Sequence, residues 1–422
     1  MDENTLLRAL FAAAVDAALP KRIVPPFVPD RVPGRLVVVG AGKASAAMAA
    51  AVEARYDGPM TGLVVTRYDH AVPCRHVEIV EAAHPVPDAA GAEGARRMLD
   101  LLHGLGEDDV VLALISGGGS ALLTLMAEGM DLDDAVTLNK ALLASGAGID
   151  AMNCIRRHLS QTAGGRLAAA AHPARLIALA ISDVPGDDLL NIASGPTVGD
   201  PTTLADARAL VARHALDLPP HMLAALDDAA NESVKPGDPR LARAEAHLIA
   251  APLASLEAAA AVARRSGLRA EIQGDALEGE ARELGAAFAE LALQRQKAMT
   301  PGDAPLVLIS GGETTVTLPR DGRDLGDGGR NVDFLMGLAQ RLDGAPGIWA
   351  LAGDTDGVDG LAEVAGAIVT PDTVARSGRE ALETALRRFD GHGYFRALGD
   401  QVITGPTLTN VNDFRAILVL PG

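Results

Sequence analysis

Short apolar runs alternate with helical sequence along most of the chain. The runs at 35–39, 62–66, 77–80, 110–115 and 176–181 are rich in Val, Ile and Leu, and several end in clusters of Gly, Ser or Asp. Runs of this length bounded by turn residues predict strands, and continuous apolar runs predict strands that are buried on both faces. With helical sequence between them, they indicate an α/β protein with a parallel sheet covered by helices.

A second series of the same kind follows a segment rich in Pro, Asp and Asn at 219–238. Residues 246–251 predict a strand, and largely helical sequence runs from there to about Lys297. After the Pro- and Gly-containing loop 301–305, residues 306–309 open another strand-and-helix series. We therefore expect two α/β lobes, with the break near 219–238 or at 301–305.

The N-terminal segment resembles a signal peptide only in its apolar content. It begins with Asp2 and Glu3, and apolar residues from Leu7 to Leu19 recur at helical spacing. This spacing predicts an amphipathic helix. No apolar run approaches the ~18 residues of a membrane span, so we expect a cytoplasmic protein.

Composition and charge narrow the class of function. The chain has 422 residues, of which 48% are hydrophobic and 22% charged, as in an ordinary globular protein. Its 37 Lys and Arg face 55 Asp and Glu, which gives a net charge of −18 and argues against binding nucleic acid or an anionic membrane. Cys74 and Cys154 are far apart, so neither a disulfide framework nor a thiolate zinc site is expected, and a reducing compartment fits.

Five loops rich in Gly, Ser and Asp follow predicted strands, at 40–45, 116–120, 182–188, 310–315 and 353–357. In α/β sheets, ligands bind beyond the carboxyl ends of the strands, so we expect these loops to form the functional site. The alternative for each loop is structural, since glycine permits positive φ and Asp caps helices.

The loop that begins at Gly40 contains a lysine but fits neither standard nucleotide motif. Val37 stands where a P-loop needs its first glycine, and Ser45 stands where the dinucleotide motif needs its third. Lys43 is one of only five lysines in the chain, and at the end of a strand it suits a phosphate or carboxylate. The alternative is a lysine that extends into solvent.

Two further loops offer chemistry without matching a known motif. Residues Ser116 to Ser120 (SGGGS) offer successive backbone N–H groups for an oxyanion, but Leu122 occupies a glycine position of the nucleophile elbow. The loop from Asp354 to Gly360 fails the calcium-loop spacing, although its carboxylates could hold magnesium through water or cap a helix. The isolated His70, His84 and His158 are expected to be structural.

Nine motifs together resemble the glycerate 2-kinase family, whose C-terminal lobe is called MOFRL and whose members are often labelled hydroxypyruvate reductases or linked to tartrate utilisation. They are VVVGAGKAS, AAHPVPD, ISGGGSALL, MNCIRRHLS, SDVPGDD with IASGPTVGDP, SGGETTV, GGRN, GDTDGVDG and TGPTLTNVNDF. They extend from about Val37 to Phe414. One departure is visible at Thr162-Ala163-Gly164-Gly165, because the family commonly has a lysine immediately before the two glycines, where Ala163 stands here.

The resemblance implies an ATP-dependent kinase that phosphorylates D-glycerate with magnesium, usually at the 2-hydroxyl, in a cleft between two lobes. It implies an N-terminal Rossmann-like, three-layer lobe with a parallel sheet over 1–235, a connecting strand and helix over 236–300, and a MOFRL α/β lobe over 301–422. It also implies that Lys43 and Arg330 are catalytic. A homodimer is one candidate assembly.

Phosphoryl transfer requires cations, metal-binding carboxylates, backbone donors and a proton acceptor. We assign the cations to Lys43 and Arg330, and the proton acceptor to Asp187 ahead of Asp356. Magnesium is expected at Asp187, Asp354 or Asp356. The predicted nucleotide-binding residues lie in three loops: Gly40, Gly42, Ser116, Gly117, Gly118, Gly119, Ser120, Gly311, Gly312, Glu313 and Thr314.

Two other functions stay open from the sequence. One is a hydroxypyruvate reductase that uses NAD(P)H, which the failed dinucleotide motif disfavours. The other is a metabolite-binding protein without catalysis, which the many charged side chains in the loops disfavour.

Overall fold

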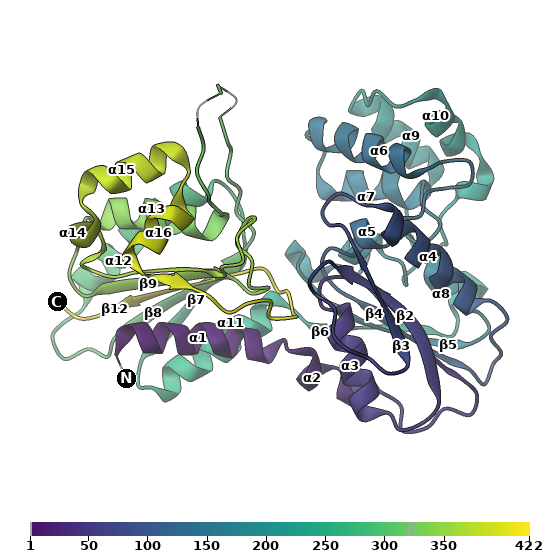
Figure 1. Ribbon diagram of the computed structural model, residues 1–422, viewed down its shortest axis with the longest axis horizontal. Helices are drawn as coiled ribbons and strands as arrows, with labels where there is room; N and C mark the ends of the chain where they lie inside the picture. The colour runs from purple at the N-terminus through teal and green to yellow at the C-terminus, as the bar shows by residue number, and fades with distance from the viewer. Residues whose placement is uncertain (1, 320, 323) are drawn as a thin grey trace. The chain divides into compact units, whose positions relative to one another are not determined.

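The computed structural model describes residues 2–319, 321–322 and 324–422. The chain divides into two compact units, one formed by residues 20–249 and the other by residues 1–19 together with 250–422. A six-stranded sheet forms the centre of each unit (Figure 1). The predicted α/β class with two lobes is confirmed.

The first unit contains the sheet of strand order β3-β2-β1-β4-β5-β6. Its strands are β1 (Leu36–Ala41), β2 (Met60–Arg67), β3 (Val77–Ala82), β4 (Val110–Ile115), β5 (Arg175–Ile181) and β6 (Ala244–Ala250). The pairs β1–β2, β2–β3, β1–β4 and β4–β5 are parallel. This is the Rossmann order, in which the succession of strands reverses direction between β1 and β4.

Helices cover the faces of this sheet. The first unit contains α2 (Pro20–Ile23), η1 (Pro25–Phe27), α3 (Ser45–Arg55), α4 (Ala89–Leu102), α5 (Gly119–Leu122), α6 (Leu132–Ala144), α7 (Ile149–His158), α8 (Arg166–Ala170), η2 (Pro185–Asp187), η3 (Ile192–Ser194), α9 (Leu204–Arg213), α10 (Pro220–Asp227), η4 (Ala229–Asn231) and η5 (Pro239–Leu241). Val37 and Val39 of β1 pack with Met98 of α4 and Leu167 of α8. A separate apolar cluster joins α6, α7, α9 and α10 around Ile155.

The second unit has a mixed sheet of order β11-β10-β9-β12-β8-β7. Its strands are β7 (Arg269–Leu277), β8 (Leu306–Gly312), β9 (Ile348–Asp354), β10 (Gly366–Val369), β11 (Gln401–Val402) and β12 (Asp413–Val419). Strands β7 and β8 are parallel, whereas β12 runs antiparallel to both of its neighbours, β8 and β9. The start of β12 therefore lies beside the ends of β8 and β9.

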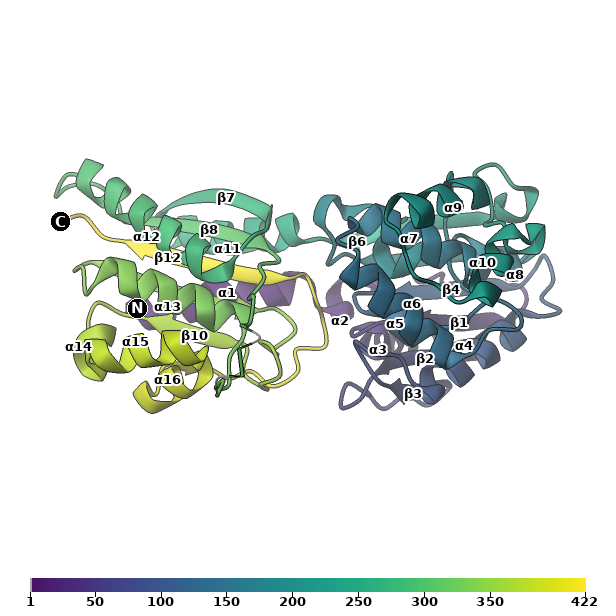
Figure 2. The same cartoon turned by 90° about the horizontal axis from the view of Figure 1, so that it is seen from above.

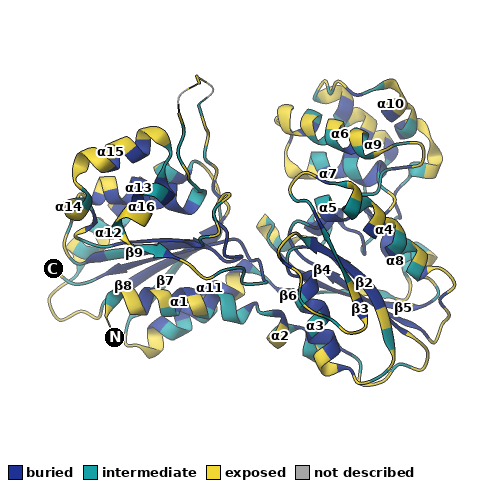
Figure 3. Ribbon diagram, in the orientation of Figure 1, coloured by how far each residue is buried: buried dark blue, intermediate teal, exposed yellow. Residues whose placement is uncertain are grey.

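Two apolar layers cover the two faces of this mixed sheet. Leu306 and Leu308 of β8 join a cluster with the helices α12 (Ala281–Ala298) and α13 (Arg330–Leu342), while Val307 and Ile309 join one with α1 (Glu3–Ala17) and α11 (Pro252–Arg265). The remaining helices are α14 (Thr373–Ser377), α15 (Arg379–Arg388) and α16 (Gly391–Leu398). Seen from above, α13 lies in front of this sheet and α1 behind it (Figure 2). Strands β8 and β12, between the layers, are buried along their whole length (Figure 3).

This division differs from the expected boundaries 1–235, 236–300 and 301–422, and from the expected break at 219–238 or 301–305. Strand β6 extends the first sheet, whereas α11, β7 and α12 belong to the second unit, as does α1. The buried face of α1 packs on the second sheet, where the rings of Phe11 and Phe414 lie 5.8 Å apart. A helical pattern predicts an apolar face but not which sheet that face covers. Among the described residues, no helix is both long and apolar enough to span a membrane.

Candidate functional site

The point where the strand order of the first unit reverses brings two of the predicted loops together. Strands β1 and β4 are neighbours there, with Ala41 opposite Ile115. Just beyond these residues, the backbone N–H of Lys43 donates to the carbonyl of Gly117 at 2.9 Å, and the N–H of Ala44 donates to Ser116 Oγ at 3.0 Å. Ligands of doubly wound sheets bind at this reversal point.

The glycines of these loops are required by the close approach of the two strands. A Cβ on Gly40 would lie 2.1 Å from the carbonyl oxygen of Leu114, and one on Gly42 would lie 2.1 Å from Ser116 Oγ. Both glycines also have positive φ, of 159° and 141°. Their structural role is therefore visible, and their predicted role in nucleotide binding stays a prediction.

Lys43 and His84 flank Gly118. A Cβ built on Gly118 would lie 2.9 Å from His84 Nε2 and 3.5 Å from Lys43 Cγ. Burial, and then the charges of Lys43, Arg67 and His70, lower the pKa of His84 to about 4. The imidazole is therefore neutral at neutral pH. From the sequence His84 was expected to be structural, although it belongs to the motif AAHPVPD.

The hydroxyl groups of the SGGGS loop are linked to the segment that follows β5. Ser120 Oγ lies 2.9 Å from Ser194 Oγ, and Ser194 Oγ also donates to Asn153 Oδ1 at 3.3 Å. Asn153 in turn donates to Asn191 Oδ1 at 3.1 Å. Three polar side chains from α7 and the loop after β5 thus fix one end of the SGGGS loop.

Asp187 lies in the loop after β5, the strand next to β4. Its backbone is left-handed, with a φ of 56°, which is uncommon for a residue other than glycine. Its Oδ1 atom is buried and has no hydrogen-bond partner among the residues that the structure describes. A buried carboxylate oxygen in this state is free to accept a bond from a ligand or a cation.

The second unit gathers its predicted residues at one edge of the mixed sheet. Asp413, the first residue of β12, lies opposite both Gly312 and Asp354. Arg330, the first residue of α13, donates from Nε to Asp413 Oδ1 at 2.8 Å, from Nη1 to Glu313 Oε1 at 2.6 Å and from Nη2 to Asp354 Oδ2 at 2.7 Å. Burial opposes the charge of the guanidinium, but these three carboxylates outweigh it and raise the pKa of Arg330 well above its usual value.

The predicted metal ligands have different surroundings. Asp354 Oδ2 accepts from Arg330, and its Oδ1 accepts from the N–H of Asp356 at 3.1 Å. Asp356 Oδ1 accepts from the N–H of Val358 at 2.9 Å. Asp187 belongs to the other unit. Within the part of the chain that the structure describes, no three His, Cys, Asp or Glu side chains are grouped to hold a metal ion.

Asp359 fixes the start of the helix that carries Arg330. Its two carboxylate oxygens accept from the N–H groups of Asn331 and Val332, both at 3.0 Å. A Cβ on Gly329 would lie 2.3 Å from the Asp359 carboxylate, so this approach requires glycine. Burial, with the charge of Asp413, raises the pKa of Asp359 to about 7 despite these hydrogen bonds.

Asp413 and Arg415 form a buried ion pair that sequence reasoning did not single out. Arg415 Nη2 lies 2.6 Å from Asp413 Oδ2 and 3.1 Å from Thr314 Oγ1, and Nη1 donates to the carbonyl of Gly311 at 3.2 Å. The pair thus connects the SGGET loop to β12. The motif that ends in NVNDF contains Asp413 but stops before Arg415.

Two family models match the chain. One, described as a domain of unknown function (DUF4147), matches residues 6–227, and the MOFRL family matches residues 306–413.

Several relatives match nearly the whole chain. A protein of Agrobacterium vitis with the provisional name hydroxypyruvate reductase is 54% identical, over 98% of this chain and 94% of its own length. The D-glycerate 2-kinase of Thermotoga maritima is 38% identical, over 95% of this chain and 94% of its own length. The crystal structure of a glycerate kinase from the same organism has a TM-score of 0.86 and 36% identity, over 99% of both chains.

Proposed function

Because the chain belongs to the family of glycerate kinases that combine these two domains, we propose that it transfers the γ-phosphoryl group of ATP to the 2-hydroxyl of D-glycerate, giving 2-phosphoglycerate. The observation that carries the proposal is the hydrogen bond from the backbone N–H of Lys43 to the SGGGS loop, at the point where the strand order of the Rossmann sheet reverses. The loop that contains Lys43 matches neither standard nucleotide-binding motif. A cation beside successive backbone donors suits a phosphate chain.

In the first unit, Lys43 and the loop 116–120 would bind and orient phosphate oxygens. Lys43 brings a positive charge, and the loop brings backbone N–H groups and the Ser120 hydroxyl. His84 stays neutral beside Lys43, so it adds a hydrogen-bonding ring without a second charge. The proposed task of this unit is to hold the nucleotide and to stabilise charge on the transferred group.

Asp187 is the member of the predicted carboxylate set that supports a direct role. Within the described part of the chain its Oδ1 has no hydrogen-bond partner, whereas oxygens of Asp354 and Asp356 already accept bonds from the protein. It fits either as the acceptor of the hydroxyl proton or as a ligand of magnesium, which commonly takes one or two carboxylates and fills its other positions with water and phosphate. Magnesium, when bound, would neutralise phosphate charge.

In the second unit, we propose that Arg330 receives an oxyanion of the substrate in place of Glu313. The side chains of Asp354 and Asp413 are 5% and 0% exposed, but that of Glu313 is 50% exposed. Glu313 is therefore the partner that can leave at the lowest cost. The vacated Nη1 would bind a carboxylate or phosphate oxygen, while Asp354 and Asp413 keep the guanidinium in position.

The alternative function is reduction of hydroxypyruvate with NAD(P)H, which the name of the Agrobacterium vitis relative suggests. At the position where the dinucleotide motif needs its third glycine, Ser45 is fully buried and donates to the carbonyl of Leu114 at 2.9 Å. This contact gives Ser45 a structural role in joining α3 to β4.

One experiment separates the two functions. The purified chain is incubated with ATP, magnesium and D- or L-glycerate, and phosphorus NMR resolves the phosphoglycerate isomers. A parallel reaction with hydroxypyruvate monitors loss of NADH and NADPH. We expect 2-phosphoglycerate from D-glycerate and no nucleotide oxidation. Oxidation of NADH without phosphoglycerate would reject the kinase.

A further inference from the structure

The first unit contains a polar pocket built from residues outside the predicted site. It has a volume of about 600 Å³ and lies between α8, η4, the segment 232–235 and the start of η5. None of its 11 lining residues belongs to the predicted catalytic, nucleotide-binding or metal-binding sets. The pocket therefore needs an explanation of its own.

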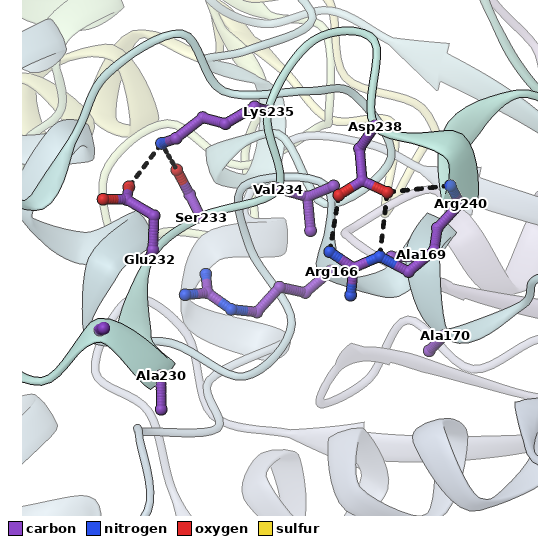
Figure 4. A pocket seen from close by; sticks show the side chains of 11 residues that line it. Arg166, Ala169, Ala170, Ala230, Glu232, Ser233, Val234, Lys235, Asp238 and Arg240 are labelled. Carbon is purple, nitrogen blue, oxygen red and sulfur yellow. Dashed lines mark hydrogen bonds and ion pairs between the residues drawn. The ribbon is translucent and has the colours of Figure 1, made fainter.

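The charged side chains of this pocket are unequally paired. Both carboxylates of the lining already form ion pairs: Glu232 Oε1 lies 2.5 Å from Lys235 Nζ, and Asp238 Oδ2 lies 2.7 Å from Arg240 Nη2. Figure 4 shows these two pairs on either side, with the side chain of Arg166 between them. Among the described residues, no carboxylate forms an ion pair with Arg166. The lining thus carries one positive charge in excess, in a chain of net charge −18.

Three backbone carbonyl oxygens hold Arg166 in position. Its Nη1 donates to the carbonyls of Arg157 and Ala163 at 2.5 and 3.3 Å, and its Nη2 donates to that of Asn231 at 2.6 Å. Burial lowers the pKa of this guanidinium to about 10, so it stays charged at neutral pH. Asp200 and Glu232 favour this charge from a distance, but among the described residues neither forms an ion pair with Arg166. A desolvated cation in this state gains from an anion in direct contact, and a side chain already fixed loses little entropy when it binds one.

The same residues connect the pocket to the loop that carries Asp187. Arg157, whose carbonyl accepts from Arg166, directs its own guanidinium to the carbonyl of Leu190 at 3.1 Å and to Asp200 at 3.0 Å. The next residue of α7, His158, lies 3.0 Å from Glu232 at the pocket wall. A ligand that contacts Arg166 is therefore linked, through Arg157, to the carbonyl of Leu190, which is three residues after Asp187.

We propose that this pocket binds a small metabolite through an oxyanion group, a phosphate or a carboxylate, with Arg166 as its principal contact. Arg240 and Lys235 at the pocket wall can turn from their own carboxylates toward the same anion. The binding site is independent of the proposed kinase activity. Occupancy should also reduce the mobility of the loop 183–195 through Arg157.

Calorimetric titration at constant ionic strength tests the binding. The probes are inorganic phosphate and malonate, which separate a phosphate from a carboxylate preference. Because phosphate can also bind near Lys43, the titrations are performed in the Lys43→Met background. We expect saturable binding there, weakened at least about tenfold by Arg166→Gln. Arg243→Gln is the matched control, since Arg243 also donates to two backbone carbonyls but does not line the pocket.

Ala170→Glu covers the case in which Arg166→Gln disturbs the fold. It keeps every bond of Arg166 and places a carboxylate in the pocket, and we expect it to weaken binding as strongly. Hydrogen exchange of the segment 183–195, measured with and without the tighter probe, is expected to slow only when Arg166 and Ala170 are intact. Absence of saturable binding in the Lys43→Met background, or equal affinity in a folded Arg166→Gln or Ala170→Glu variant, would overturn the proposal.

Discussion

Arg330 and Asp413 are 83 residues apart in the sequence, yet Arg330 Nε donates to Asp413 Oδ1 at 2.8 Å. Asp413 binds Arg415 through its other oxygen at 2.6 Å. One buried carboxylate therefore joins two arginines, one at the start of a helix and one in the strand at the centre of the second sheet. This relationship makes Asp413 a support of both the fold and the candidate site.

Asp413→Asn should destabilise the second unit. The change leaves the fully buried Arg415 without its charged partner, and removal of one member of a buried ion pair costs about 3 kcal/mol or more. Urea unfolding followed by circular dichroism measures the free energy. Asp343→Asn, which breaks the exposed pair with Arg379, serves as control and is expected to leave the unfolding midpoint unchanged. Equal midpoints for the two variants would show that the buried pair contributes little.

Arg330→Lys should keep the charge but lose the fork that reaches three carboxylates. A lysine ammonium cannot reproduce the three separate directions of Nε, Nη1 and Nη2. We expect kcat/KM for D-glycerate to fall at least about tenfold, which corresponds to about 1.4 kcal/mol of transition-state binding.

The matched control for this change is Arg396→Lys, since Arg396 pairs with the half-exposed Asp327 outside the cluster. Circular dichroism establishes that both variants fold. An unchanged kcat/KM in Arg330→Lys would remove Arg330 from the site and leave it a role in bracing α13.

Lys43→Met should lower kcat on the order of 10³-fold if Lys43 neutralises charge on the transferred phosphoryl group, because loss of a preorganised charge has effects of this size. Steady-state assay with ATP and D-glycerate gives kcat and KM. The fold should remain intact, since methionine keeps the backbone N–H through which residue 43 bonds the carbonyl of Gly117. Turnover within about threefold of the original chain would favour a lysine that only extends into solvent.

The depressed pKa of His84 makes part of the stability depend on pH. The folded-state pKa of about 4 lies below the ordinary 6.5, so between these values the unfolded chain binds a proton that the folded chain does not. The contribution of the neutral His84 ring to the free energy of unfolding is fully present above about pH 6.5 and is lost as the pH falls toward 4. In His84→Gln this loss should disappear, so the difference in free energy of unfolding between the original chain and the variant should shrink as the pH falls.

The same histidine reports on Lys43. Since the charge of Lys43 lowers the pKa of His84, Lys43→Met should raise that pKa toward its usual value, as measured by NMR titration of labelled histidine. Lys140→Met is the control, because Lys140 is exposed and does not act on His84. If His84 titrates identically in Lys43→Met and Lys140→Met, the side chains of Lys43 and His84 do not interact.

The local elements of this protein follow from short stretches of sequence. The run predicted as a strand at 35–39 overlaps β1, the run at 176–181 lies within β5, and most of the N-terminal apolar pattern lies in the helix α1. These elements were predictable because a continuous apolar run or a helical repeat describes how one segment buries its own side chains. The motifs also led to the family, which the matches to known proteins confirm.

The tertiary structure alone decided which segments meet. No local pattern encodes the insertion of β12 between β8 and β9, because strands pair through backbone N–H and C=O groups, which nearly every residue carries. The apolar face of α1 likewise does not specify which of the two sheets it covers. For this reason the sequence alone does not show the partners of Arg330, which in the structure are Glu313, Asp354 and Asp413. The sequence determined the local elements and the chemistry available in the loops, and long-range packing determined which charges stand side by side.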